Sequence, residues 1–135
     1  MSRVRTGVEM GILLGLVLSA LLWVAAQPAH AQTVDECQAE IAELKVQTQN
    51  TTFIGQSAAK DQAGLIGKLD SASAKLGQGK FQDALANLQS FRTKVVALDQ
   101  QGKIADEDAS TLIAGADEAL ACVQGLIDAQ ATSTA

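Results

Sequence analysis

The sequence contains no tyrosine, and its only tryptophan, proline and histidine lie close to the N-terminus, at Trp23, Pro28 and His30. From Gln32 onward the chain therefore has no imidazole, the group that general acid–base catalysis uses most often. A transition-metal site would have to depend on carboxylates, which is uncommon. A sugar-binding platform would lack tryptophan and tyrosine rings for stacking. We expect no catalytic activity, no metal site and no cofactor.

Positive charge is also scarce beyond the N-terminus. From Gln32 onward, eight lysines and arginines stand against fourteen aspartates and glutamates, so the net charge of this part is near minus six. Such a charge repels nucleic acid and anionic membrane surfaces, and no basic cluster interrupts it. We expect neither as a partner. A protein or another component of the cell envelope stays open as the partner, as does the oligomeric state.

A single long apolar run, Gly11–Ala26, follows Arg3 and Arg5. Two small residues, Ala29 and Ala31, come after it at the positions that a signal peptidase reads, as in a signal peptide that is cleaved after Ala31. Its sixteen residues fall short of the roughly 20 that cross a bilayer core, which disfavours the alternative of an uncleaved anchor. The sequence thus predicts a signal peptide over 1–31, a mature protein with no stable membrane insertion, and a periplasmic or extracellular location.

Two cysteines, Cys37 and Cys122, lie near the two ends of the mature chain. In an oxidising compartment they are expected to pair. A bridge over about 85 residues would stabilise the fold by about 4 kcal/mol in the loop-entropy model. The alternative of a redox or metal pair lacks the short spacing that such pairs use.

Apolar residues recur at alternating steps of three and four, the spacing of one helix face. The segments expected to be helical are 33–49, 56–76, 81–101 and a fourth from 106 onward. Thr33 and Glu36 fit a capping box, Gly77–Gly79 and Gly102 fit helix stops, and Asp106 fits the N-cap of the fourth helix. The core positions predicted from this spacing are Val34, Cys37, Ile41, Leu44, Leu65, Leu69, Ala72, Leu76, Phe81, Ala84, Leu88, Phe91, Val95, Leu98, Ala109, Leu112, Ala116, Ala119, Val123 and Leu126.

Two glycines, Gly64 and Gly67, fall inside the second helical segment. Glycine within a helix costs roughly 1 kcal/mol relative to alanine. Their presence indicates either close packing against another backbone or a break, so the first two helices could also form one kinked helix.

These features predict an all-α fold, an antiparallel bundle of four helices, or of three at minimum, over 32–130. The disulfide would join the first helix to the last. Residues 131–135 are expected to form a disordered tail.

The last three predicted helices carry a pattern that resembles the FIMAH domain over about 63–127. The matching residues are Leu65, Leu69, Leu76, Gly79, Ala84, Leu88, Phe91, Val95, Gly102, Lys103, Ile104, Ala109, Leu112, Ile113 and Ala116. Members of this family are small helical modules of bacterial extracellular proteins, often appended to hydrolases, whose own role is not established. The resemblance implies an extracellular helical module in a bacterial protein. The chain departs from the pattern at Arg92–Lys94 and in its added N-terminal helix.

The expected function is that of a non-catalytic module for protein interaction, or a structural module, at the bacterial cell envelope or outside the cell. The turn Gly102–Lys103–Ile104 is the expected binding surface, because packing does not account for a lysine between a helix stop and an acidic helix start. The alternative is a carrier of a small hydrophobic ligand, which would need a pocket lined by Leu and Phe side chains within the bundle.

Overall fold

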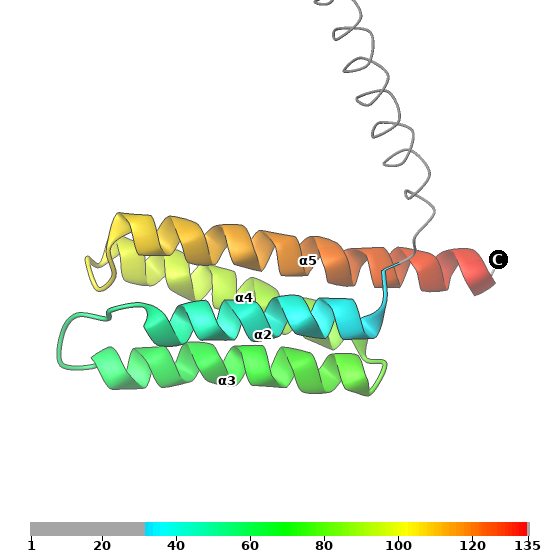
Figure 1. Cartoon of the computed structure of the whole chain (residues 1–135), viewed down its shortest axis with the longest axis horizontal. Helices are drawn as coiled ribbons and strands as arrows, with labels where there is room; N and C mark the ends of the chain where they lie inside the picture. The colour runs from blue at the N-terminus through cyan, green and yellow to red at the C-terminus, as the bar shows by residue number, and fades with distance from the viewer. Residues whose placement is uncertain (1–31, 135) are drawn as a thin grey trace, which may run out of the picture. The chain divides into compact units, whose positions relative to one another are not determined.

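The structure is a computed structural model that describes residues 32–134. The predicted signal peptide over 1–31 lies outside the described residues. In the described part the chain forms four helices and no strand, α2 (Val34–Asn50), α3 (Ala58–Gly77), α4 (Phe81–Gln100) and α5 (Asp106–Thr134) (Figure 1). The all-α prediction is confirmed, and the first two helices are separate.

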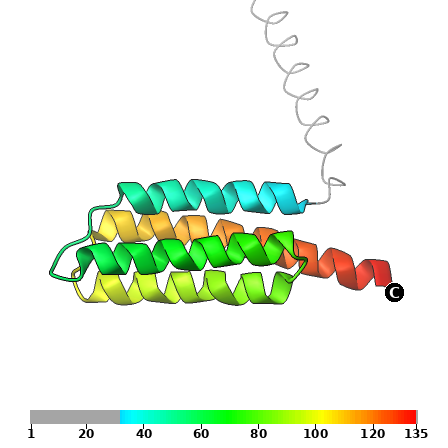
Figure 2. The ribbon, with the colours of Figure 1, turned by 90° about the horizontal axis from the view of Figure 1, so that it is seen from below.

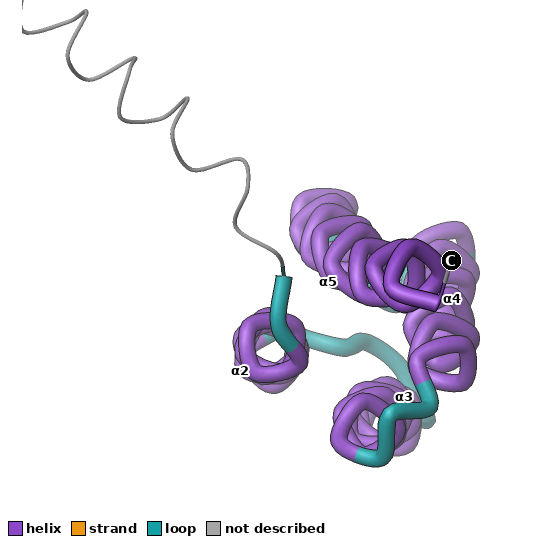
Figure 3. The backbone as a smooth tube through the Cα atoms, turned by 90° about the vertical axis from the view of Figure 1, so that its right-hand side faces the viewer, coloured by secondary structure: helices purple, strands orange, loops and turns teal. Residues whose placement is uncertain are grey.

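Successive helices run antiparallel and pack in a closed ring. α2 and α4 each contact both α3 and α5, so that α2 and α4 stand at opposite corners in the end view of Figure 3. The α2–α3 loop and the α4–α5 turn lie together at one end of the bundle, and the α3–α4 turn lies at the other (Figures 1 and 2). The α2–α5 seam and the α3–α4 seam are therefore on opposite sides.

The core lies where the helical spacing predicts it. Every predicted core position is buried except Val34 and Phe81, which are half-buried against it. Cys122 and Ile104 complete the core, with 2 % and 3 % exposed surface. The apolar face of each helix thus points to the centre of the ring, and burial of these faces is the main source of stability.

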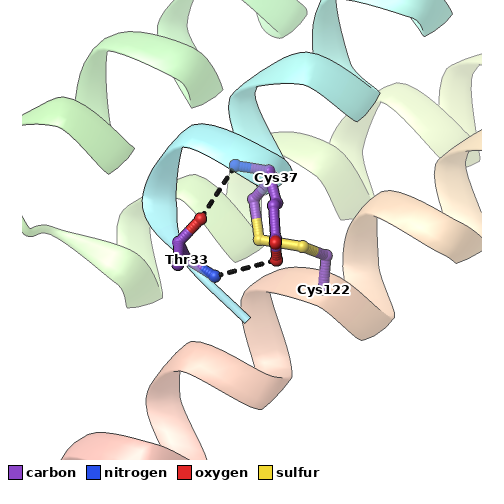
Figure 4. Close-up of a disulfide and its surroundings, with 4 residues drawn as sticks. Thr33, Cys37 and Cys122 are labelled. Atoms are coloured by element: carbon purple, nitrogen blue, oxygen red, sulfur yellow. Dashed lines mark hydrogen bonds between the residues drawn. A yellow bond between two sulfur atoms is a disulfide. The ribbon is translucent and has the colours of Figure 1, made fainter. Parts of the chain in front are cut away.

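The disulfide closes the ring between the first and the last of these helices. Cys37 and Cys122 are bonded (Figure 4), with their Cα atoms 5.6 Å apart, and both are buried. One turn before Cys37, the capping box forms as predicted: the Glu36 amide donates to the Thr33 hydroxyl at 3.2 Å, and the Thr33 amide donates to the Glu36 carboxylate at 3.2 Å. Such disulfides are typical of extracellular and periplasmic proteins.

The two short turns end α3 and α4 in the same way. Gly79 and Gly102 adopt φ of +76° and +69°, the left-handed conformation that glycine enters without penalty. After Gly102 the chain folds back, so that the Lys103 amide donates to the Leu98 carbonyl at 2.9 Å; after Gly79 the Lys80 amide donates to the Lys75 carbonyl at 2.9 Å. Both are Schellman motifs, which satisfy the last carbonyls of a helix.

The two interior glycines of α3 do not have the role predicted for them. A Cβ atom at Gly64 or Gly67 would meet no neighbouring atom within 4 Å, and α3 continues through both. Both expectations, close packing and a helix break, are therefore wrong. The packed face of α3 supplies enough burial to hold the helix together despite two weak helix formers.

Two boundaries of α5 also differ from the prediction. Asp106 is the first residue of the helix and not its cap, because the Ala105 carbonyl already accepts from the Ala109 amide at 2.9 Å. At the other end the helix continues to Thr134, where a tail was expected. Alanines without an intervening breaker carry the helix on, and the Thr132 hydroxyl donates back to the Asp128 carbonyl at 3.0 Å.

Candidate functional site

The predicted binding turn lies in a surface that we call the loop end. It consists of the α2–α3 loop, residues 51–57, and the α4–α5 turn, residues 101–105. The two segments are joined by a backbone hydrogen bond, in which the Ile54 amide donates to the Lys103 carbonyl at 2.8 Å. Two loops distant in the sequence thus form one ordered surface.

The three predicted residues of the turn have three different surroundings. Gly102 is exposed at the tip. The Lys103 side chain is 34 % exposed, whereas Ile104 is 3 % exposed and belongs to the core. Of the three, only Gly102 and Lys103 offer atoms to a partner, and Ile104 anchors the turn.

Lys103 also binds an acidic centre beneath the surface. Its Nζ atom lies 3.7 Å from Asp61 Oδ2 and donates to the Ser57 hydroxyl at 3.3 Å. Ser57 in turn donates to Asp61 Oδ2 at 3.0 Å, and Lys94 Nζ lies 3.7 Å from Asp61 Oδ1. Asp61 is 8 % exposed and links α3 to the α4–α5 turn.

The electrostatics of this centre favour an ionised carboxylate. Burial by itself would raise the pKa of Asp61, but the hydrogen bond from Ser57 and the positive charges of Lys103 and Lys94 outweigh it and lower the pKa. Asp61 is therefore charged at neutral pH, and it holds the Lys103 ammonium close to the surface. The lysine is positioned by the fold before any partner arrives.

An exposed apolar side chain lies next to this lysine. Ile54 is 55 % exposed, although its backbone is fixed by the hydrogen bond to Lys103. The neighbouring Phe53 packs partly against the core. The loop end therefore presents an exposed apolar side chain on a residue whose backbone is hydrogen-bonded to that of the partly exposed Lys103.

Sequence reasoning missed Ile54, Ser57 and Asp61. A signal for Asp61 was present, because it precedes Leu65 by four residues and Leu69 by eight, which places it on the core face of α3. An acidic residue on a core face needs a partner. No comparable signal marked Ile54, whose exposure depends on the path of the loop.

A hollow of about 260 Å³ beside the α3–α4 turn is open to solvent, and Phe81 and Ile127 lie among the polar residues that line it. It is lined by one Phe and no Leu, and so differs from the interior pocket that a hydrophobic carrier would need. The carrier alternative stays a prediction without an observation in its favour.

The structure also brings some carboxylates together. Asp99 and Asp106 meet across the α4–α5 turn, and a hydrogen bond between the two carboxyl groups, together with burial and the charge of Asp106, raises the pKa of Asp99. Within residues 32–134, no group of three His, Cys, Asp or Glu side chains is arranged to hold a metal ion. None of the four helices described is long and apolar enough to cross a membrane.

The chain matches no protein-family model, no curated protein and no solved structure. The resemblance to the FIMAH domain accordingly stays a prediction.

Proposed function

We propose that the chain is an exported, non-catalytic helical module that binds a protein partner at the bacterial cell envelope or outside the cell. The observation that carries the proposal is the loop end, where the exposed Ile54 side chain and the Lys103 ammonium stand on a backbone fixed by hydrogen bonds. A rigid surface loses little conformational entropy when it binds, so an ordered apolar side chain with a charge beside it favours recognition.

The chemistry of the surface indicates the kind of partner. An apolar contact would cover the exposed Ile54 side chain, and an acidic group opposite Lys103 would add a second ion pair to the one that the lysine makes with Asp61. A protein segment with an apolar residue next to a carboxylate has these properties. The resemblance to extracellular helical modules agrees with this role, since such modules are joined to, or act beside, other proteins.

A photo-crosslinking experiment tests the proposal. A photoreactive amino acid placed at Ile54 of the exported full chain is expected to give a discrete adduct in the envelope or secreted fraction. Lys103→Glu, which reverses the charge beside it, is expected to reduce this adduct by roughly tenfold, the effect of about 1.4 kcal/mol. Val46 is the matched control, because it is exposed to 53 % against 55 % for Ile54 but lies on α2. No adduct at Ile54, or equal adducts at both positions, would contradict the proposal.

The export part of the proposal has its own measurement. Mass spectrometry of the exported protein is expected to show a chain that starts at Gln32 and is lighter by the hydrogens lost on disulfide formation. A chain that retains residues 1–31, or one with free thiols, would count against export through a cleaved signal peptide.

A further inference from the structure

The charges of the described chain are divided between two sides of the bundle. α2 and α5 carry ten of the fourteen acidic residues and one basic residue, Lys45. Residues 51–105, which include α3 and α4, carry seven basic and four acidic residues. The α2 and α5 side has a net charge of minus nine and the α3 and α4 side one of plus three, which leaves a strong asymmetry within a chain that is acidic overall.

The acidic charge concentrates along the α2–α5 seam. Glu40, Glu43 and Glu118 surround a hollow of about 30 Å³ between these helices, and both Glu43 and Glu118 are exposed. Burial and the charges of Glu118, Glu36 and Glu43 raise the pKa of Glu40. Negative charges are thus crowded here, and a cation from outside would relieve their repulsion.

The α3–α4 seam on the opposite side has the complementary character. It forms an open groove of about 500 Å³ with Lys68 and Lys94 in its wall and no carboxylate among its lining residues. Lys94 is already paired with Asp61 behind the wall, at 3.7 Å. Lys68 donates to the neutral Ser90 hydroxyl at 3.4 Å, so its charge is available to an acidic partner. The remaining wall includes Ala86 and Ala97, whose small side chains allow another helix to come close.

We propose that the α3–α4 groove of one molecule receives the acidic α2–α5 seam of a second copy of this chain. The occupant is chosen by charge complementarity, because the groove is cationic and each copy carries a matching acidic helical surface. The contact is heterologous, since the two surfaces differ and lie on opposite sides. Repetition of such a contact gives a head-to-tail row and not a closed two-fold dimer.

The net charge of the molecule sets the conditions for this association. Copies with a charge near minus six repel each other over long distances, but at about 0.15 M salt charges beyond roughly 8 Å are screened, whereas close ion pairs are less affected. At about 1 M salt the screening length falls to roughly 3 Å and the close pairs weaken as well. The association is therefore present at moderate salt and lost at high salt.

Sedimentation of the exported, disulfide-closed protein tests this arrangement. The wild type is expected to show species larger than a monomer that increase with protein concentration at about 0.15 M salt and disappear at about 1 M. Lys68→Glu in the groove, or Glu118→Lys in the seam, is expected to weaken self-association more than about tenfold, because each places like charges opposite one another. Lys60→Glu makes the same charge change on the exposed start of α3, outside the groove lining, and is expected to associate as the wild type does.

A mixture of the two variants distinguishes a head-to-tail contact from other geometries. The Lys68→Glu protein keeps an intact seam and the Glu118→Lys protein keeps an intact groove, and the two reversed surfaces carry opposite charges again. A head-to-tail contact is therefore expected to rebuild rows in which the two variants alternate, whereas growth that stops at one-to-one dimers would indicate a two-fold contact and contradict the head-to-tail geometry. A wild type that is monomeric at every concentration, a mixture that stays monomeric, or a Lys68→Glu variant that associates like the wild type would overturn the proposal. Lys103→Glu lies at the loop end and is expected to leave self-association unchanged. The proposed binding of a partner at the loop end and the proposed self-association can therefore be disproved independently of each other.

Discussion

The two seams on opposite sides of the bundle are held together by different means. α3 and α4 are neighbours in the sequence, joined through the Gly79 turn, so the short connection alone keeps their ends close. α2 and α5 are the first and last of the four helices, and a disulfide across 85 residues joins them. Helices that are adjacent in the chain need only a turn and an apolar face, whereas helices at its ends gain most from a covalent link.

Electrostatics sharpens this contrast. Ion pairs cross each of the other three contacts: Lys45 with Asp70 at 2.8 Å between α2 and α3, Lys94 with Asp61 at 3.7 Å between α3 and α4, and Arg92 with Asp117 at 2.7 Å between α4 and α5. The α2–α5 seam instead gathers Glu40 and Glu118 on facing helices. The disulfide thus joins the two helices whose facing carboxylates repel each other.

Removal of the disulfide is expected to have the largest effect. Cys37→Ala with Cys122→Ala should lower the free energy of unfolding by about 4 kcal/mol, because the open chain regains the conformational entropy of an 85-residue loop. Urea unfolding of the wild type with and without reductant, beside the double variant, measures this loss.

Amide hydrogen exchange then localises the effect. Protection in α2 should fall more than protection in α3 and α4, since the short turn still joins those two helices. Equal unfolding free energies with and without the bond, or a uniform loss of protection, would contradict the contrast between the seams.

Alanine in place of glycine is expected to act in opposite directions in α3 and in α5. Gly64→Ala and Gly67→Ala should each stabilise the protein by up to about 1 kcal/mol, because their Cβ atoms would enter open space in a helix interior. A Cβ atom at Gly115 would lie 2.8 Å from the Cδ1 atom of the buried Leu44. Overpacking at this position should cost roughly 1–3 kcal/mol, which is more than the gain in helix propensity. We therefore expect Gly115→Ala to lower the free energy of unfolding by about 1 kcal/mol.

Thermal and urea unfolding of the three variants, each with circular dichroism of the native state, measures this difference. The α3 variants serve as controls for the general effect of alanine in a helix. If Gly115→Ala stabilised the protein as much as the α3 variants do, the two helices of the α2–α5 seam would not be in close contact at Gly115.

These glycines also mark the limit of what could be predicted from the sequence. Apolar spacing gives the rotational phase of each helix separately, so most of the buried positions could be predicted and are confirmed. Among the exceptions are Phe81, which is only half-buried, and Ile104, which was expected in the binding turn and lies in the core. The spacing gives no information on how closely two helices approach. Gly64 and Gly115 therefore look alike in the sequence, although one is open and the other lies against Leu44.

The same limit applies to the candidate site. The helix stop at Gly102 could be predicted, because a left-handed turn after an apolar repeat calls for glycine. Which loop lies beside that turn depends on the antiparallel order of four helices and on the path of residues 51–57. For this reason Lys103 could be singled out, while the neighbouring Ile54 and the Asp61 centre beneath it could not.

The smallest predicted effect concerns the pH dependence of stability on the two sides. Glu40 has a raised pKa, because burial and the charges of Glu118, Glu36 and Glu43 disfavour its ionised form. The unfolded chain then releases the proton at lower pH than the folded one, so stability increases as the pH falls through the raised pKa towards the ordinary glutamate value. Glu40→Gln removes this dependence and should stabilise the protein at neutral pH by roughly 0.5 kcal/mol, the size of an unfavourable like-charge pair four residues apart.

Asp61 provides the opposite case and the control. Its pKa is lowered, so the stability that it contributes is complete above the ordinary aspartate value and is lost as the pH falls below it. Asp61→Asn should thus flatten the stability–pH curve below the ordinary aspartate pKa. Glu40→Gln should flatten it at higher pH, between the ordinary glutamate pKa and the raised pKa of Glu40. Urea unfolding at a series of pH values separates the two windows. If Glu40→Gln left the curve unchanged, the repulsion that we assign to the α2–α5 seam would be absent, and the charge contrast between the two seams would rest on the α3–α4 lysines alone.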